Sequence, residues 1–515
     1  MSQQNREQWG TRTGFLLAAI GSAVGLGNIW RFPYVAYDNG GGAFLIPYLV
    51  ALLTAGIPLL ILEYAIGHRF RASPPAAYRR LNRFAQPLGW WQVGICFVIS
   101  VYYAVIVAWA VRYAGFSLTQ SWGEDPEAFL YGNFLHVAEA PGPLGSYNLG
   151  VLIPLVAIWL VVLVVLALGV RRGIEWANRI FIPLLAVLFL ILVIQALFLD
   201  GAEVGLNAFF APDWSAITDG SVWVAAYGQI FFSLSVGFGI MITYASYLRR
   251  KSDLAGSALV AGFANSSFEL LAGIGVFATL GFMASAANVP VSEVATDGLG
   301  LAFVAFPQII NNIPVAPALF GVLFFVSLMV AGLTSLVSIV EVVISSVRDR
   351  TGMRRVPAVL VVGGFTAAVS VAVFPTDQGL YLLDVTDHFI NQYGIALAAL
   401  VVVVVVGWAL WRLPMLRRHT EAVSSVPMRV WWALTLGVVT PVVLGFMMYD
   451  SISAELAANY GDYPSWFLNS AGWGVAVGVV VLAVLISLIP WKRRAGDEDD
   501  TNATVAAADQ SGKGQ

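Results

Sequence analysis

Residues 21–33 read GSAVGLGNIWRFP, and this stretch decides the fold. It lies inside an apolar segment, residues 14–38, that is long enough to span a bilayer. Glycine weakens a helix by about 1 kcal/mol relative to alanine, so the glycines at 21, 25 and 27 predict a break midway through the membrane. Backbone freed by a break is tolerated there only where it faces protein or a cavity. Bare carbonyls suit a small cation, and the positive end of the second half-helix suits a carboxylate, so the stretch predicts a binding site for both.

Composition places this stretch in a polytopic helical membrane protein. The 515 residues are 59% hydrophobic and 11% charged, with a mean hydropathy of +0.79. The single cysteine, Cys96, excludes an intramolecular disulfide and a cysteine metal cluster. Neither an HExxH nor a Walker A motif occurs, which argues against a metalloprotease and against direct use of ATP. The net charge of −3 says little about partners; for a chain of this composition we expect the lipid bilayer, and no nucleic acid, as a partner.

Hydropathy predicts twelve spans. They cover residues 14–38, 42–67, 88–117, 147–169, 175–199, 222–247, 255–284, 315–347, 356–375, 381–411, 428–449 and 466–490. With this count every Lys and Arg except Arg31 and Arg112 falls on the side of both termini. The positive-inside rule makes that side cytoplasmic, so we predict a multi-pass plasma-membrane protein with residues 1–13 and a disordered tail, residues 491–515, in the cytoplasm.

The sixth predicted span repeats the pattern of the first. Residues 235–239 read SVGFG and residues 23–27 read AVGLG, which agree at three of five positions. Five spans separate one unit from the next, so the two units insert with opposite orientation. Paired glycine-interrupted segments in two halves point to a transporter site at the membrane midplane, although close helix packing through small residues is an alternative. We therefore predict five-helix repeats at 14–199 and 222–411, followed by two further helices at 428–490.

At these residues the chain resembles the neurotransmitter:sodium symporter family, in its prokaryotic LeuT-like branch. The matching blocks are Arg6–Trp9, Gly21–Pro33, Asn39–Ala43, Gly228–Tyr247 and Ala331–Ser335. The resemblance extends from about residue 6 to 490, and it implies an all-α fold of twelve transmembrane helices, with a 5+5 inverted repeat and broken helices 1 and 6.

The resemblance implies two sodium sites built from neutral oxygens, which suit a hard cation that must leave again. The first would use the carbonyl of Ala23, the amide oxygens of Asn28 and Asn265, the hydroxyl of Ser233 and the substrate carboxylate. The second would use carbonyls of Gly21, Val24 and Ala331 with the hydroxyls of Thr334 and Ser335. Considered alone, those two hydroxyls are more typical of hydrogen bonding to a carbonyl one turn earlier.

The substrate would lie between spans 1, 3, 6 and 8. By resemblance, the N–H groups of Leu26 and Gly27 and the hydroxyl of Tyr103 would hold its carboxylate, and free carbonyls near Phe232 and Ser233 its ammonium group. Further lining residues would be Ala23, Gly25, Ile99, Ser235, Phe238, Ser335 and Ile339. These groups are mostly apolar, which favours a neutral hydrophobic amino acid. Amine transporters of the family carry Asp where this chain has Gly25.

Charged groups within spans mark function by default. Arg31 and Asp387 would form an outer gate above an aromatic lid of Tyr103 and Phe232, or an ion pair that merely joins spans 1 and 10. The inner gate would pair Arg6 with Asp349, and would be completed by Trp9, Ser246 and Tyr247.

Three buried acids have separate expectations. Glu269 lies one turn beyond Asn265, where chloride-independent members of the family carry a carboxylate, so we expect transport that does not require chloride. We expect Glu63 to accept hydrogen bonds from stranded N–H groups of span 6. Glu341, near the substrate end of span 8, has no confident role and would bias the pocket toward a polar substrate.

The predicted function is sodium-driven import of an amino acid by alternating access, with no enzymatic activity. A sensor that binds its ligand without moving it, or a symporter of another small zwitterion or osmolyte, would use the same pocket. An intramembrane hydrolase is disfavoured because no GxSxG surrounds Ser233 or Ser235. The oligomeric state is left open.

Overall fold

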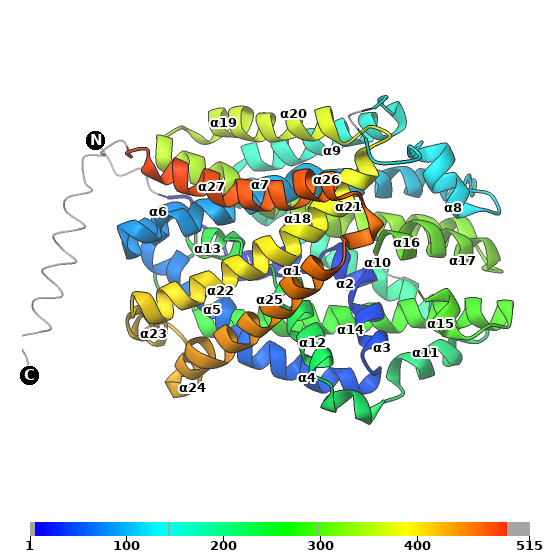
Figure 1. Cartoon of the computed structure of the whole chain (residues 1–515), viewed down its shortest axis with the longest axis horizontal. Helices are drawn as coiled ribbons and strands as arrows, with labels where there is room; N and C mark the ends of the chain where they lie inside the picture. Colours follow the sequence, from blue (N-terminus) through cyan, green and yellow to red (C-terminus); the bar gives the residue numbers. More distant parts are fainter. Residues whose placement is uncertain (1–5, 143–144, 296–297, 492–515) are drawn as a thin grey trace, which may run out of the picture.

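The structure, a computed structural model, describes residues 6–142, 145–295 and 298–491, and every regular element in these ranges is a helix. The predicted tail lies outside the described residues except for Trp491. Figure 1 shows long helices packed side by side. Arg6 pairs with Asp349, and the neighbouring Arg350 lies over the ring of Trp491, so the two described ends lie on one side of the molecule.

Ten helical stretches are long and apolar enough to cross a membrane, judged by length and composition. They are Gly42–Phe70, Arg83–Phe116, Leu149–Ala167, Val170–Leu197, Leu254–Ala287, Pro317–Thr351, Arg355–Val373, Gly379–Ala409, Arg429–Asp462 and Ser465–Leu488. They coincide with predicted spans two to five and seven to twelve, and the eleventh runs further than predicted, to Asp462. A bent pair of helices accounts for the first span.

The parts of these stretches carry separate labels in Figure 1. Their α-helical parts are α4 (Leu45–Ala51), α5 (Ile57–Phe70), α7 (Gln86–Phe116), α9 (Leu149–Ala167), α10 (Trp176–Leu197), α14 (Leu254–Ala287), α18 (Pro317–Thr351), α19 (Arg355–Ala358), α20 (Gly364–Val373), α21 (Gly379–Phe389), α22 (Ala396–Val404), α24 (Arg429–Leu434), α25 (Thr440–Ala457), α26 (Ser465–Phe467) and α27 (Gly474–Leu488). Short helices between them are α6 (Pro74–Leu81), α8 (Pro126–Ala128), α11 (Ala202–Phe210), α15 (Val291–Val294), α16 (Gly298–Gly300), α17 (Phe306–Asn312) and α23 (Leu413–Glu421).

The first span is broken, as the sequence predicts. Helix α1 (Arg12–Ala23) ends before Val24, and the chain resumes as α2 (Leu26–Trp30) and α3 (Phe32–Asp38) at an angle of 58° to α1. At the break the Gly25 N–H donates to Oδ1 of Asn28 at 2.8 Å, so a side chain one turn along caps the new helix.

The sixth span is also broken, and its gap is longer. Helix α12 (Gly220–Ser233) stops, residues 234–239 leave the helix, and α13 (Ile240–Ala245) follows. Gly237 and Gly239 have φ of +95° and +83°, a region that side chains with a Cβ rarely adopt. Both predicted interruptions are therefore confirmed, whereas the inverted-repeat relation between the two halves stays a prediction.

Side chains from two neighbouring helices satisfy the peptide groups in the gap of span six. Glu63 of α5 accepts from the Gly237 N–H at 2.9 Å, and Gln92 of α7 donates to the Gly237 carbonyl at 3.0 Å. Cys96 of α7 donates to the Phe238 carbonyl at 3.1 Å. The role expected for Glu63 is confirmed, and α5 and α7 together hold the unwound segment in place.

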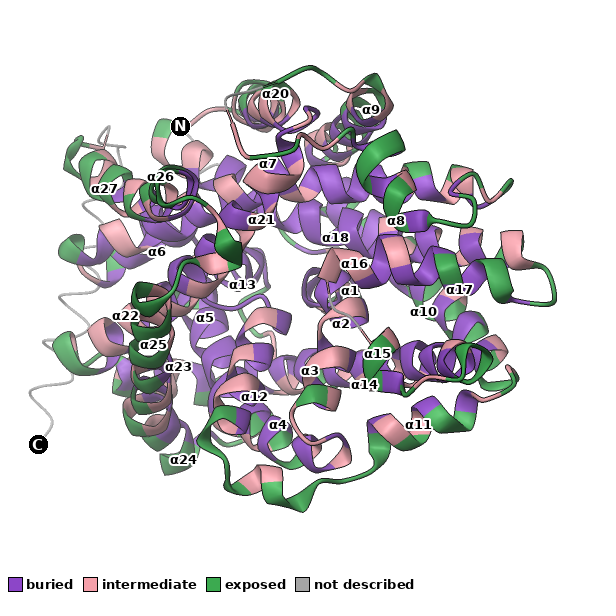
Figure 2. Cartoon of the chain, turned by 45° about the vertical axis from the view of Figure 1, so that its right-hand side comes forward, coloured by how far each residue is buried: buried purple, intermediate pink, exposed green. Residues whose placement is uncertain are grey.

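The broken helices lie inside a bundle of long ones. Helices α7 and α18 pack along each other, and α14 packs against α10 and α11. Figure 2 shows α5, α7, α13 and α18 mostly buried and α24 and α25 exposed along one side. Large apolar side chains stand exposed on the outer helices, among them Leu160, Phe365 and Phe446. Such a surface is typical of contact with lipid.

We expect Gly237→Ala to destabilise the protein by about 1–3 kcal/mol, because the added Cβ is strained at this positive φ. It would also lie 3.1 Å from the Ile395 carbonyl oxygen. Thermal unfolding in detergent measures the loss. The matched control is Gly364→Ala in α20, where a Cβ meets nothing within 4 Å. Equal melting temperatures for the two variants would contradict the strain at Gly237.

Candidate functional site

The two interrupted helices meet through their own polar groups. Ser235, in the gap of span six, donates its hydroxyl to the Ser22 carbonyl at 2.7 Å. The Ser335 hydroxyl of α18 lies 3.4 Å from the carbonyl oxygens of both Gly21 and Ser22. The last turn of α1 thus presents its carbonyls to spans six and eight at the break. Whether Ser235 also contacts substrate stays a prediction.

The side chains predicted for the first sodium site form one continuous chain of hydrogen bonds. Asn28 donates through Nδ2 to Oδ1 of Asn265 at 2.8 Å, and Asn265 donates to the Ser233 hydroxyl at 3.1 Å. All three are buried, as is Ala23, the predicted carbonyl donor. An amide oxygen has two lone pairs, so each Asn oxygen accepts one hydrogen bond and keeps capacity for a cation. The donor set is neutral and consists of oxygen, which fits sodium.

The second predicted sodium set is brought together in part. Ser335 reaches the Gly21 carbonyl, as described above, and Val24 and Ala331 are buried. The Thr334 hydroxyl donates instead to carbonyls of its own helix, at 2.9 Å to Ala331 and 3.2 Å to Val330. Hydrogen bonding to the preceding turn, the alternative for this hydroxyl, is therefore what the structure contains.

Gly25 and Gly27 line the predicted substrate pocket because they lack side chains. A Cβ on Gly25 would lie 3.2 Å from the Ser335 hydroxyl oxygen and 3.3 Å from that of Tyr103. A Cβ on Gly27 would lie 2.1 Å from the ring of Phe232, so that ring rests directly on the Gly27 backbone. The Leu26 N–H donates to the Tyr103 hydroxyl at 3.5 Å, a long hydrogen bond. The N-terminus of α2 therefore faces Tyr103.

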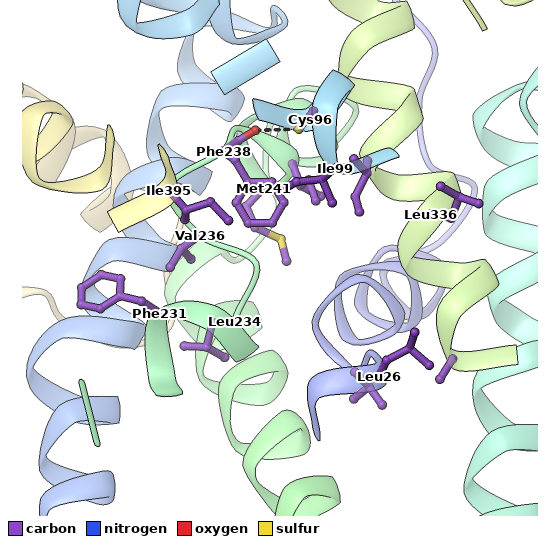
Figure 3. Close-up of a cluster of buried hydrophobic side chains, with 14 of the residues drawn as sticks. Leu26, Cys96, Ile99, Phe231, Leu234, Val236, Phe238, Met241, Leu336 and Ile395 are labelled. Atoms are coloured by element: carbon purple, nitrogen blue, oxygen red, sulfur yellow. Dashed lines mark hydrogen bonds between the residues drawn. The ribbon is translucent and has the colours of Figure 1, made fainter. Parts of the chain in front are cut away.

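Apolar side chains fill the space around this helix end. Figure 3 shows Ile99 of α7, Phe238 from the gap and Met241 of α13 pointing toward one another, with Leu26 apart from them at the lower right. Ile99 and Ile339 are each 5% exposed and Phe238 is 6% exposed. Ile99, Phe238 and Ile339 are thus buried, whereas Gly25, Tyr103 and Phe232 are only partly buried.

Arg31 and Phe232 cover one side of this region, the side predicted to face outward. The Arg31 guanidinium carbon lies 4.6 Å from the centre of the Phe232 ring, a cation–π contact. Beyond them a cavity of about 400 Å³ opens between α12, α21 and α25, and its lining includes Arg31, Phe232, His388 and Glu455. Asp387 accepts from the Asn391 side chain at 2.7 Å. The gate role of Arg31 and Asp387 stays a prediction.

Glu269 lies at the centre of a polar cluster beside the first sodium set. One of its carboxylate oxygens accepts from the Tyr48 hydroxyl, and the other accepts from Gln229 at 2.6 Å. Tyr48 also bonds to the Ser266 hydroxyl at 2.8 Å. Tyr48 and Gln229 are partners that the sequence interpretation missed, although Gln229 precedes Ser233 by one helical turn, which was an available signal.

The contacts predicted for the inner gate are present. Arg6 pairs with both carboxylate oxygens of Asp349, at 2.8 and 3.0 Å, and with the Ser246 hydroxyl at 3.0 Å. Its guanidinium lies over the Tyr247 ring at 5.0 Å. The Trp9 indole donates to the Tyr244 carbonyl at 2.9 Å and is buried. The segment before α1 is thus fixed across spans six and eight.

The expectation for Glu341 is wrong. Its carboxylate accepts from the Tyr247 hydroxyl at 2.6 Å and pairs with Arg355 at 2.8 Å, so it belongs to the inner network and not to the substrate pocket. It is fully buried, and a second acid, Glu7, bridges Arg355 and Arg348. The position of Glu341 on span eight does not by itself show whether the residue lies beside the pocket or further along the helix. The contacts that decide this involve Arg355 and Glu7, which belong to other segments of the chain.

Glu7 lies outside the predicted spans, and its ionisation is set by this network. Burial alone would raise the pKa of Glu7, but Arg355, the Val170 N–H and Arg348 stabilise the carboxylate, and the pKa lies below its ordinary value. A lowered carboxyl pKa contributes stability above the ordinary pKa and loses it as the pH falls through the lowered value. The Glu7 contacts are therefore complete at neutral pH.

One family model and several known proteins are similar in sequence to this chain. The family model described as the sodium:neurotransmitter symporter family matches residues 6–129 and 123–494. An uncharacterized sodium-dependent transporter of Methanocaldococcus jannaschii is 41% identical over 485 residues, covering 94% of this chain and 98% of the relative. The sodium-dependent dopamine transporter of Bos taurus is 30% identical, covering 92% and 73%. The sodium- and chloride-dependent glycine transporter 2 of Xenopus laevis is 27% identical, covering 94% and 68%.

We expect Glu341→Gln to destabilise the protein by about 3–5 kcal/mol, because it removes a charge from a buried ion pair. In a double-mutant cycle with Arg355→Met, thermal or denaturant unfolding should give a coupling of at least about 1 kcal/mol.

The control for this cycle is Glu421→Gln, which removes a half-exposed partner of Arg417 at 3.7 Å. That change should cost less than about 1 kcal/mol. Additive single-variant effects at Glu341 and Arg355 would mean that the pair contributes no interaction of its own.

Proposed function

Because the chain belongs to the sodium:neurotransmitter symporter family, we propose that it imports a neutral, mainly hydrophobic amino acid together with sodium. The observation that carries this proposal is the meeting of two interrupted helices, where buried amide, hydroxyl and carbonyl oxygens gather without a formal charge between them. Freed peptide groups at such a depth require polar partners, and a cation with a zwitterion supplies them.

The proposed substrate has a carboxylate, which lies at the N-terminus of α2. The Leu26 N–H already donates to the Tyr103 hydroxyl, and in this proposal both groups bind the carboxylate together with the Gly27 N–H, because a helix N-terminus favours an anion. Because position 25 is glycine and not an acid, its side chain neither repels a substrate carboxylate nor pairs with the amine of a substrate that lacks a carboxylate. Glu341 is used in the inner network, and the apolar surroundings of Ile99, Phe238 and Ile339 favour an uncharged side chain.

The proposal includes two sodium ions with different coordination. At the first site the ion binds Asn28, Asn265, Ser233, the Ala23 carbonyl and the substrate carboxylate, so ion and substrate each strengthen the binding of the other. At the second site the carbonyls of Gly21, Val24 and Ala331 act with Ser335. Thr334 joins this set while its hydroxyl still donates to its own helix, because a hydroxyl that donates one hydrogen bond keeps lone pairs for a cation.

We further propose that transport does not require chloride. The Glu269 carboxylate is fully buried and held by Tyr48 and Gln229 beside Asn265 and Ser233. A fixed negative charge there offsets the sodium charge that a bound chloride would otherwise offset. Of the three relatives reported above, the Xenopus laevis glycine transporter 2, whose name includes chloride dependence, has the lowest sequence identity to this chain.

Alternating access follows from the contacts on the two sides of the site. Arg6, Asp349, Trp9 and Tyr247 close one side, which we assign to the cytoplasm with both termini, in the plasma membrane. On the other side the Phe232 ring covers the pocket and Arg31 covers the ring. Transport then requires these two sets of contacts to open in turn, with spans 1, 2, 6 and 7 rocking against the rest.

We expect purified protein in proteoliposomes to accumulate a neutral amino acid when sodium is high outside, and not when potassium replaces it. The substrate is first found by a thermal-shift screen of the twenty amino acids in sodium and in potassium. Gly25→Asp should abolish uptake, because its carboxylate lies where the substrate carboxylate binds.

The two alternatives give different results in the same experiments. A sensor would bind tightly in sodium without accumulation, and an osmolyte symporter would show no stabilisation by any amino acid. Uptake at the same rate in potassium would overturn sodium coupling.

We expect Glu269→Ser to make uptake depend on chloride, because the variant removes the fixed charge and leaves a hydroxyl beside Tyr48, Gln229 and Ser233. The measurement compares initial uptake in chloride and in gluconate. Glu203→Ser, at an exposed site on α11, is the matched control and should keep the chloride-independent behaviour. Equal initial uptake rates of the Glu269→Ser variant in chloride and in gluconate would contradict this part of the proposal.

A further inference from the structure

We propose that a lateral groove between spans two, seven and eleven binds one hydrocarbon chain of an anionic membrane glycerolipid, with its headgroup held by Lys251 and Arg429. The groove has a volume of about 240 Å³ and is distinct from the central site. This inference concerns the lipid-facing surface, and it stands whether or not the proposed substrate is correct.

The lining of this lateral groove is entirely apolar. It consists of Leu53, Ile57, Ile61, Ala255, Leu259, Val426, Met428 and Trp431. Leu53 and Trp431, which are 46% and 38% exposed, border it on the outer surface. A hollow with such walls on a membrane-facing surface is filled by an apolar occupant and not by water.

Hydrogen bonds between the walls fix the shape of the groove. The buried indole of Trp432 donates to the Pro58 carbonyl at 3.0 Å, which ties α24 to α5. The Ala255 N–H donates to the Ser424 hydroxyl at 3.1 Å, and Ser425 donates to Asp253 at 2.6 Å. The segment before α24 is thereby tied to the start of α14, so hydrogen bonds join the walls of the groove to one another.

The charge at the mouth of the groove selects the headgroup. Lys251 lies four residues before Ala255, and Arg429 lies between the lining residues Met428 and Trp431; both are exposed. Exposed Arg250 and Arg418 add to the positive charge on this side. The nearby acids are already paired, Asp253 with Arg12 at 3.2 Å and Glu421 with Arg417 at 3.7 Å. An anionic headgroup therefore meets unopposed cations where its chain enters the groove.

Trp431 makes the proposal measurable. The protein is placed in lipid nanodiscs that contain increasing fractions of phosphatidylglycerol or phosphatidylcholine with brominated acyl chains, which quench tryptophan fluorescence on contact. The chain has 17 tryptophans, so the Trp431 signal is the difference between wild type and Trp431→Phe. We expect half-maximal quenching of Trp431 at about tenfold lower mole fraction for phosphatidylglycerol, and a smaller ratio at high salt.

Two charge-reversal variants separate a headgroup site from general attraction. Lys251→Glu combined with Arg429→Glu should remove the preference for phosphatidylglycerol, whereas Arg83→Glu, exposed before α7, should keep it. Equal quenching of the wild type by the two lipids would overturn the headgroup assignment. Identical quenching of wild type and Trp431→Phe would overturn the groove itself. If both charge variants lost the preference for phosphatidylglycerol equally, the headgroup assignment would also be overturned, because only general surface attraction would remain. The salt series is measured on the wild-type protein, so it tests the headgroup assignment even if a variant fails to fold.

Discussion

The structure depends on one constraint: peptide groups that leave a helix inside a membrane must find partners within the protein. Span one solves this over two residues, Val24 and Gly25, with Asn28 as the cap. Span six solves it over six residues, with Glu63, Gln92 and Cys96 reaching in from α5 and α7. The two gaps then join through Ser235 and the Ser22 carbonyl. Carbonyls that remain available at this junction are what make an ion-binding site there physically reasonable.

Much of the fold could be predicted from the sequence because its signals are local. Apolar length gave ten spans close to their observed bounds, and glycine spacing located both interruptions. Asn28 and Ser233 could be predicted because each belongs to a short segment that resembles the family, whereas Asn265 followed only from the resemblance of the chain as a whole. Three of the observed partners had no such signal. Tyr48 beside Glu269, and Arg355 with Glu7 beside Glu341, depend on how spans two, seven, eight and nine and the N-terminal segment pack.

Glu341 shows why such an error arises. An acid inside an apolar span suggests function, and its place on span eight suggested the pocket. The deciding facts are that Tyr247 donates to it and that Arg355 pairs with it. Charge within a span marks a polar environment, but only the packing of the neighbouring helices tells which environment that is.

Helix α13 has six residues, with unwound backbone on one side and loop residues on the other. A helix this short is not stable by itself, so its order comes from neighbours such as Gln92 and Cys96 and from the Trp9 indole on Tyr244. The order of this buried segment therefore depends on contacts that other spans and the N-terminal segment supply. Amide hydrogen exchange should therefore be faster in this segment than in α7 or α18, even though the segment lies deep in the protein.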